Sequence, residues 1–271
     1  ASCGPNSEEY FYITDFVRYP KLYWLALIFA LLVILIGRWK GLRALIALLI
    51  SFVIIMKFIV PQILAGSSPL FVSILGSIFI LLTVIYLTEG FKSRSHLAIL
   101  SIGLSLILVG FLSVVFTNLA RLSGFAQEEV LFLFNFGLGT LNFKGLLLAG
   151  IILGTLGVLD DAVISQIASV EQIQSANPSL SKKEIYSKAM QIGTSHMSSM
   201  INTLFLVYAG ASLPLLLLFN INSAPFLSFN QILNSEMIAI EVVRTLAGSI
   251  GLILSIPIAT FLASCFLKNK K

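Results

Sequence analysis

Long apolar segments separated by short polar ones follow one another along almost the whole chain. A run of about 20 apolar residues is long enough to cross the hydrocarbon core of a bilayer as a helix. Seven segments approach or exceed this length, at residues 22–37, 44–60, 69–87, 97–117, 145–169, 198–219 and 240–266. The pattern therefore predicts an all-α integral membrane protein with seven transmembrane helices.

The composition agrees with this prediction. Apolar residues make up 58% of the chain and charged residues only 11%, a balance typical of membrane proteins. The formal net charge is +5, but the Lys and Arg residues stand at the ends of the apolar segments. They indicate a lipid bilayer as the partner and no nucleic acid.

The basic residues also indicate the orientation, because cytoplasmic loops of membrane proteins are enriched in Lys and Arg. They are concentrated in every second connection, namely the turn at 38–43, the loops at 88–96 and 170–196, and the C-terminal tail. The connections between these contain none, or offset them with acids. We expect the N-terminus outside the cell and the C-terminus inside.

The spans divide the chain into regions. Residues 1–21 are expected to form an external tail, residues 22–60 two additional transmembrane helices, and residues 61–271 the core. Within the core, residues 125–144 mix aromatic side chains with glycines and acids, which fits an interfacial helix, a re-entrant loop or an ordinary connection. Residues 181–196 begin with a capping-box pattern and continue with apolar residues at helical spacing, which predicts a cytoplasmic amphipathic helix.

Two adjacent carboxylates, Asp160 and Asp161, lie inside the fifth apolar segment. A charge at bilayer depth costs from about 2.5 to well over 10 kcal/mol, and two neighbouring acids there cannot both stay ionised without a cation nearby. A pair that readily holds a proton is typical of a proton relay. Alternatively, the acids only hydrogen-bond a neighbouring helix. A metal site is disfavoured because no ligand motif surrounds the pair.

Small residues share one helical face with Asp161. They are Gly150, Gly154, Gly157, Ser165 and Ala168. Glycines on one face let another helix approach closely. The last apolar segment has a similar face with Gly248 and Gly251, and we expect these two faces to pack together.

Polar residues at the start of the sixth segment lie at a depth comparable to that of the aspartates. They are Ser198, Ser199, Asn202 and Thr203. Together with Ser165 they are candidates to support a proton path, or else they hold helices together by hydrogen bonds. His196, just before them, fits either an interfacial residue or a relay group. Glu241 and Arg244 on the last segment are three residues apart, so we expect them to pair; they too are candidate supporting residues.

Four stretches of the chain closely resemble the YibE/YibF family of multi-spanning bacterial membrane proteins. They are Leu156–Asp161, Ala176–Ser181, Gly193–Asn202 and Tyr208–Phe219. The resemblance extends from about Phe16 to Ala263. It implies a multi-pass protein of the bacterial cytoplasmic membrane and says little about activity.

The segment from Gly157 to Glu171, followed by a basic surface helix and a span, more distantly resembles the fourth and fifth transmembrane helices of resistance-nodulation-division (RND) transporters and of related Sec accessory subunits. This resemblance implies an RND-like half-bundle from about residue 69 onward, with Asp160 and Asp161 as proton carriers. The chain has one half of such a core and lacks the basic relay residues of the other half. The resemblance therefore implies a homodimer, or a heterodimer with a second family member.

These observations favour a membrane transport or export protein that is coupled to the proton gradient through the Asp–Asp pair. A phosphate-binding loop is absent, so ATP is not the direct energy source, and no cofactor is expected. The alternative is a structural or assembly subunit whose acids only organise a helix interface. Enzyme activity is not expected, because two adjacent acids on one helix cannot face each other across a peptide bond and no zinc-protease motif is present.

Overall fold

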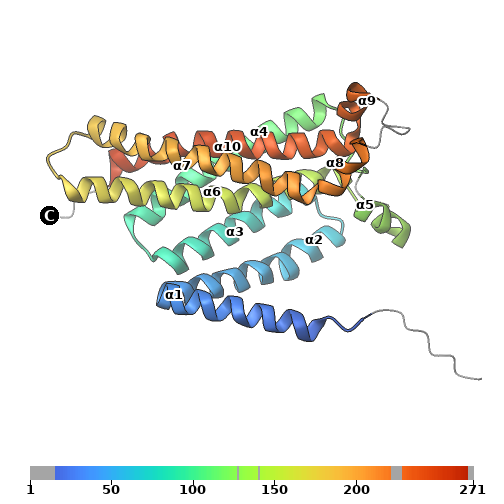
Figure 1. The fold of residues 1–271 in the computed structure, drawn as a ribbon, viewed down its shortest axis with the longest axis horizontal. Coiled ribbons are helices and arrows are strands. Elements are labelled where there is room, and N and C mark those ends of the chain that lie inside the picture. Colours follow the sequence, from blue (N-terminus) through green and yellow to red (C-terminus); the bar gives the residue numbers. More distant parts are fainter. Residues whose placement is uncertain (1–15, 127, 140, 221–227, 268–271) are drawn as a thin grey trace, which may run out of the picture. The chain divides into compact units, whose positions relative to one another are not determined.

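The regular structure of this chain is helical throughout the part described by the computed structural model, which is residues 16–126, 128–139, 141–220 and 228–267. The long helices are α1 (Tyr19–Ile54), α3 (Pro69–Glu89), α4 (Ser93–Leu119), α6 (Phe143–Ala176), α7 (Lys182–Ala211) and α10 (Glu236–Phe266). The short ones are the π-helix η1 (Ile55–Ile59), α2 (Val60–Leu64), α5 (Glu128–Leu133), the π-helix η2 (Phe134–Leu138), α8 (Leu213–Asn220) and α9 (Phe229–Asn234). Figure 1 shows their order along the chain.

Within the described residues, five helical stretches are long and apolar enough to cross a membrane, at Tyr19–Leu64, Pro69–Glu89, Ser93–Leu119, Phe143–Ala176 and Glu236–Phe266. They confirm the prediction of an all-α membrane protein. The expected external tail falls mostly on residues 1–15, which lie outside the described residues.

The first of these stretches has 46 residues, and a straight helix of that length would be about twice as long as the hydrocarbon core is thick. A turn at Arg38 interrupts it, where the backbone has φ 48° and ψ −131°. The next residues come so close to the preceding helix that a Cβ atom on Gly41 would overlap the carbonyl oxygen of Val33. The sharp turn predicted at residues 38–43 is therefore present. The chain forms two compact units, residues 1–46 and 47–271, and the turn belongs to the first.

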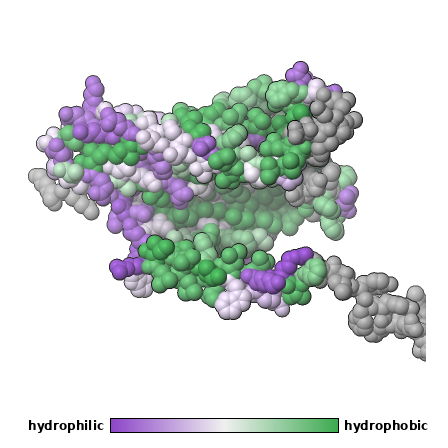
Figure 2. All heavy atoms as spheres, in the orientation of Figure 1, coloured by the Kyte–Doolittle hydropathy of each residue, from purple (hydrophilic) through white to green (hydrophobic). Residues whose placement is uncertain are grey.

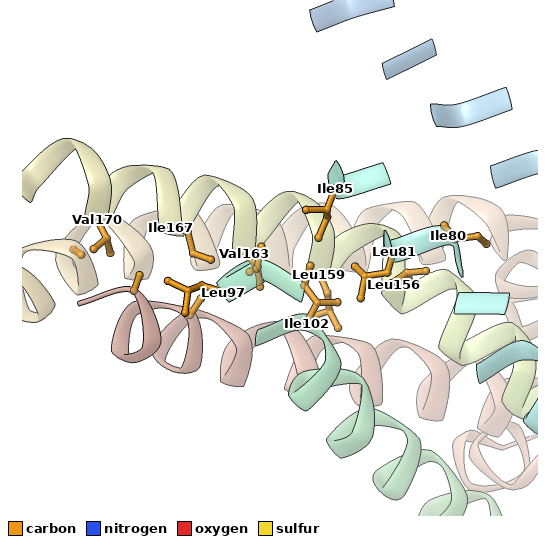
Figure 3. Close-up of a cluster of buried hydrophobic side chains, with 14 of the residues drawn as sticks. Ile80, Leu81, Ile85, Leu97, Ile102, Leu156, Leu159, Val163, Ile167 and Val170 are labelled. Atoms are coloured by element: carbon orange, nitrogen blue, oxygen red, sulfur yellow. The ribbon is translucent and has the colours of Figure 1, made fainter. Parts of the chain in front are cut away.

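The second unit is built around α6. Its buried side chains Leu156, Leu159, Val163, Ile167 and Val170 form one face of the helix. Figure 3 shows these side chains in a row against the labelled side chains of α3 and α4. Apolar contact of this kind does not distinguish protein from lipid tails, so close packing and buried hydrogen bonds must contribute to the association of the helices.

Gln166 supplies such a hydrogen bond at the centre of the unit. It is 1% exposed, and its Nε2 donates to the Ala189 carbonyl oxygen of α7 (2.9 Å) and to the Thr260 hydroxyl of α10 (2.7 Å). One amide thus joins three helices. It also fixes how α6 and the antiparallel α7 are aligned, which determines what lies opposite the aspartates.

Polar contacts mark the two ends of the second unit. At one end, Arg94 bonds Glu89 and Glu171, and Lys182 Nζ donates to the Cys265 carbonyl oxygen. The loops at 90–92 and 177–181 and the end of α10 therefore lie together. At the other end, the backbone of Ser123 and Gly124 donates to Glu236. Within this unit, the described parts of the connections that were predicted to alternate lie at opposite ends (Figure 1).

Between residues 181 and 219 the helix boundaries differ from the predicted ones. Residues 182–211 form one continuous helix, so the predicted surface helix at 181–196 continues directly into the following apolar segment instead of forming a separate element. No proline interrupts it, and Gly193 in its interior packs tightly against Gln166. The predicted span at 198–219 is instead divided at Ser212, because Pro214 cannot continue the hydrogen bonding of the helix before it.

Residues 128–138 of the predicted interfacial segment are helical, in α5 and η2. The exposed aromatic side chains of this segment include Phe132, Phe134 and Phe136. Aromatic side chains are enriched at membrane–water interfaces. The depth of this segment relative to a bilayer remains a prediction.

The capping box at the start of α7 is present as predicted. The backbone N–H and the hydroxyl of Ser181 both donate to Glu184 Oε2, at 2.8 and 2.7 Å. Both bonds lower the pKa of the Glu184 carboxyl below its ordinary value, and the bond from the Ser181 hydroxyl contributes the larger part. A lowered pKa means that the ionised form is bound more strongly in the folded state, so this stabilisation is full above the ordinary pKa and is lost as the pH falls through the lowered one.

We therefore expect the first turn of α7 to loosen in acid. Protection of the amides at 183–186 against hydrogen exchange should fall several-fold between about pH 7 and about pH 3, a range that spans the usual carboxyl pKa. In Ser181→Ala protection should be low at both pH values, because the capping side chain is gone. Equal protection in the two proteins at about pH 7 would contradict the role of this box.

Candidate functional site

Asp160 and Asp161 lie near the middle of α6, about 26 Å from its first residue by the rise of 1.5 Å per residue. The two side chains differ in surroundings. Asp161 is exposed on the surface of the unit, whereas Asp160 is half-buried towards α3. Among the described residues, the buried Oδ1 of Asp160 has no hydrogen-bond partner. The two carboxylates therefore lie at and just beneath the surface of the unit, outside its apolar core.

The face of α6 that contains Asp161 is open. Gly150, Gly154, Gly157 and Ser165 are all exposed, and a Cβ atom added to Gly150 or Gly157 would meet nothing within 4 Å in the described part of the chain. At Gly154 such an atom would approach the Tyr208 hydroxyl at 3.6 Å. The small residues thus form an exposed strip with a carboxylate in it.

The expected packing of this strip against α10 is wrong. Gly248 and Gly251 of α10 are buried, but a Cβ atom on Gly248 would lie 3.3 Å from Thr155 Oγ1, and one on Gly251 would overlap Val109 of α4. Thr155 is about 100° around the helix from Gly154. The glycines of α10 therefore let it approach a different face of α6, between α6 and α4, and the strip lies beside α7 instead, with the Tyr208 hydroxyl near Gly154.

His196 of α7 lies across from Asp161. Gln166 bonds the carbonyl of Ala189 and packs on Gly193, and because α6 and α7 run antiparallel, five residues back along α6 correspond to about five residues forward along α7. This alignment places His196 at the level of Asp161, and the two side chains are close enough to interact electrostatically. Of the two interpretations of His196, interfacial residue or relay group, this position favours the second.

The polar row of α7 follows His196 towards the other end of the unit. Its hydroxyls bond their own helix: Ser198 donates to the carbonyl of Thr194 (3.0 Å), Ser199 to that of Ser195 (3.4 Å) and Thr203 to that of Ser199 (3.0 Å). Together with Asn202 these side chains lie towards the surface. In the single chain they are therefore directed outward beside the α6 strip, and their donors are not engaged by the two carboxylates.

A charged network at the end of the unit was not anticipated from the sequence. Arg94 Nη1 bonds Glu171 at 2.9 Å and its Nη2 bonds Glu89 at 2.5 Å, and Glu89 is near enough to Asp160 to act on it electrostatically. Acidic groups thus extend from the end of α3 to the half-buried aspartate. The sequence offers one signal for this network, because Glu89 follows an apolar segment and stands five residues before Arg94. Only the tertiary structure shows that Glu171 also bonds Arg94.

Glu241 and Arg244 form the expected ion pair, with Arg244 Nη1 3.1 Å from Glu241 Oε1. The pair adjoins a cavity of about 260 Å³ between α7 and α10, lined by Tyr208 and Glu241 among mostly apolar residues. It lies towards the opposite end of the unit from the Arg94 network. No contact joins it to the aspartates in the described structure, and its supporting role there stays a prediction.

A profile of the YibE/F-like protein family matches residues 25–269, nearly the whole chain and all of the site. The chain belongs to the YibE/F-like protein family. Comparison with curated proteins and with solved structures gave no match. The site of this YibE/F-like protein must therefore be interpreted from its own side chains.

Those side chains include no cluster suited to a metal ion. Within the described residues, no three or more His, Cys, Asp or Glu side chains converge as metal ligands. The groups near the aspartates of the YibE/F-like protein are a histidine, a second acid and hydroxyls. This set is suited to exchanging protons.

Proposed function

We propose that this YibE/F-like protein is a membrane transport or export protein coupled to the proton gradient, with Asp161 as the principal proton carrier and Asp160 as the acid that tunes it. The observation that supports this most is the placement of an exposed carboxylate in the middle of a membrane-spanning helix, opposite His196. Ionisable groups at this depth are costly and are characteristic of proton and ion pathways. The proposed function includes no enzyme activity.

A proton path from the predicted cytoplasmic end is part of the proposal. Glu89, Arg94 and Glu171 form a charged group at that end, and Asp160 lies within electrostatic range of Glu89. Protons would reach Asp160 from this side and pass to its neighbour Asp161. A groove of about 470 Å³ between α3 and α4, lined by apolar residues, would fit a hydrophobic substrate.

The finer architecture is proposed on the same basis. Seven crossings follow if the turn at Arg38 divides the first stretch and if α7 with α8 crosses the membrane. The N-terminus is then outside and the C-terminus inside a bacterial cytoplasmic membrane, since the end with Lys92, Arg94 and Lys182 is the basic one. The part from residue 69 onward is proposed to be RND-like, completed by a second copy or by a second family member.

The orientation is tested by cysteine labelling. In a background with Cys3 and Cys265 replaced by Ser, Ser179→Cys in the 177–181 loop should react with a membrane-impermeant maleimide only after the cytoplasmic side is opened. Ser68→Cys, in a loop at the opposite end of the unit, should react in intact cells. Both positions are exposed, so the two thiols should react equally well once the reagent reaches their side of the membrane. The reverse pattern would overturn the orientation.

The function is tested in vesicles reconstituted with the purified protein and containing a pH-sensitive dye. An imposed pH gradient should drive uptake or release of cell-extract compounds, and proton flux should accompany it. Flux that is unchanged when both aspartates are replaced by asparagine would reject proton coupling.

The alternative function is that of a structural or assembly subunit. The observation that favours it is the open strip on α6. On that view the acids only organise a helix contact. Replacing the aspartates by asparagine would then reduce complex formation and leave proton flux unaltered.

A further inference from the structure

The groove between α3 and α4 has the length of one acyl chain. Its walls extend from Leu70 to Leu81 on α3 and from Gly103 to Val114 on α4, and its volume is about 470 Å³. At 1.5 Å per residue each wall is about 16 Å long, roughly half the thickness of the hydrocarbon core. The groove therefore spans one leaflet, from one end of the second unit to about the middle of the two helices.

The groove exists because two of its lining positions have no side chain. A Cβ atom added to Gly103 would meet nothing within 4 Å in the described chain, and one on Gly110 would meet only Ile152 Cδ1, at 4.0 Å. Exposed Ile107 and Phe111 form part of its rim. Figure 2 shows hydrophobic residues over much of the second unit, with hydrophilic and weakly polar ones gathered over one end. The groove is thus a hollow in an apolar surface, and its interior suits a lipid tail.

A basic group lies at one mouth of the groove. Asn118 follows Val114 by one helical turn, on the same face of α4. Its Nδ2 donates to the Val114 carbonyl oxygen (2.7 Å), and its Oδ1 accepts a hydrogen bond from Lys144 Nζ (2.6 Å). The ammonium group therefore lies beside the end of the groove that Val114 and Leu70 mark.

The charge of Lys144 is not balanced within the protein. Its acceptor Asn118 is uncharged, and among the described residues no carboxylate pairs with Lys144. An ammonium group has three N–H donors, so donors remain for a ligand. A negatively charged group at this mouth would gain both the charge and the hydrogen bonds.

We propose that the groove binds one acyl chain of an anionic phospholipid, whose phosphate lies at Lys144. The mouth is at the end of the unit where α3 begins and α4 ends, so a lipid of that leaflet would place its headgroup there and its tail towards the membrane centre. A free phosphate would leave the groove empty, and an uncharged lipid would leave Lys144 unpaired. The inference names a ligand for the groove and does not depend on the proton coupling.

Fluorescence quenching by brominated lipids tests the site in vesicles, after Trp24 and Trp39 are replaced by phenylalanine. Phe111→Trp then places the only indole on the rim of the groove. Phe71→Trp is the matched control, because Phe71 is exposed, does not line the groove and lies about as far along α3 from the loop at 90–92 as Phe111 lies along α4. The probes are phosphatidylglycerol and phosphatidylcholine with brominated chains.

The Phe111→Trp protein should prefer phosphatidylglycerol about 5-fold, the usual contribution of one basic group near a lipid headgroup. The Phe71→Trp protein should show no preference. Adding Lys144→Gln to Phe111→Trp should abolish the preference, whereas Lys92→Gln, the same change in an exposed residue at the opposite end of the unit, should preserve it. Equal quenching by the two lipids, or a preference that survives Lys144→Gln, would overturn the proposal.

A filled groove separates chain binding from attraction of the headgroup alone. Gly103→Leu with Gly110→Leu places two side chains in the groove, where each has space to begin. The preference should then fall below about 2-fold. If it stays near 5-fold, the headgroup binds at the surface and the groove proposal is wrong. Weak quenching of the Phe111→Trp protein by both lipids would show that protein covers the groove, and would be equally decisive against it.

The outcomes keep this proposal apart from the proposed function. If the lipid preference is found but proton flux does not depend on the aspartates, the lipid site stands and the proton coupling fails. If flux depends on Asp161 but no preference is found, the lipid site fails and the coupling stands.

Discussion

Asp161→Asn is expected to reduce proton-coupled flux in reconstituted vesicles by about 100-fold or more, the usual contribution of a positioned proton-transfer group. Asparagine keeps the size of the side chain and its carbonyl oxygen but cannot take up a proton. Asp161 is exposed on α6 with His196 across from it, so the substitution leaves the packing of the unit unchanged. A loss of flux would therefore report lost proton exchange, with folding intact.

Asp160→Asn should have a smaller effect, because its half-buried carboxylate is assigned to tuning and supply. Glu184→Gln is the matched control: it makes the same chemical change in an exposed cap at the start of α7 and should leave flux unchanged. Infrared difference spectra provide a second measurement, in which a protonated carboxyl band should be lost in Asp161→Asn. Full flux in this variant would reject the proposed carrier.

Gly193→Ala and Gly251→Ala are expected to destabilise the protein by about 1–3 kcal/mol each, the usual cost of overpacking a core. A methyl group on Gly193 would lie 2.6 Å from Ile256 Cγ2 and 2.8 Å from Gln166 Oε1, and one on Gly251 would overlap Val109. Ile256 and Val109 are β-branched and fully buried, so neither side chain can move aside easily. The helices must separate instead, and at Gly193 this also disturbs the central amide of Gln166.

Alanine at Gly210 and Gly150 serves as the control. Gly210 lies in the same helix as Gly193, and Gly150 lies in α6; a Cβ atom added to either would meet nothing within 4 Å in the described chain. The substitution there should be neutral or stabilising by up to about 1 kcal/mol, since alanine has the higher helix propensity. Denaturant unfolding in detergent micelles measures all four variants. Equal stability in the two pairs would contradict the packing described above.

The apolar pattern by itself determined most of the secondary structure. Segment length predicts a membrane helix because the bilayer thickness imposes it, and the helices around 69–87, 97–117, 145–169 and 240–266 are present with ends a few residues away. Local side-chain chemistry likewise predicted the Ser181 capping box, the turn near Arg38 and the Glu241–Arg244 pair. These features depend on residues that are close in the chain.

Only the tertiary structure decided what surrounds the aspartates. The sequence places Asp161 on a glycine face, but helical periodicity does not say which neighbour a face meets, and α10 packs against Thr155 instead of that strip. The levels of His196 and Asp161 agree because Gln166 aligns two antiparallel helices. Glu171 meets Arg94 across a separation of 77 residues. Such relations depend on how helices are aligned and rotated, which a one-dimensional pattern of apolar residues does not contain.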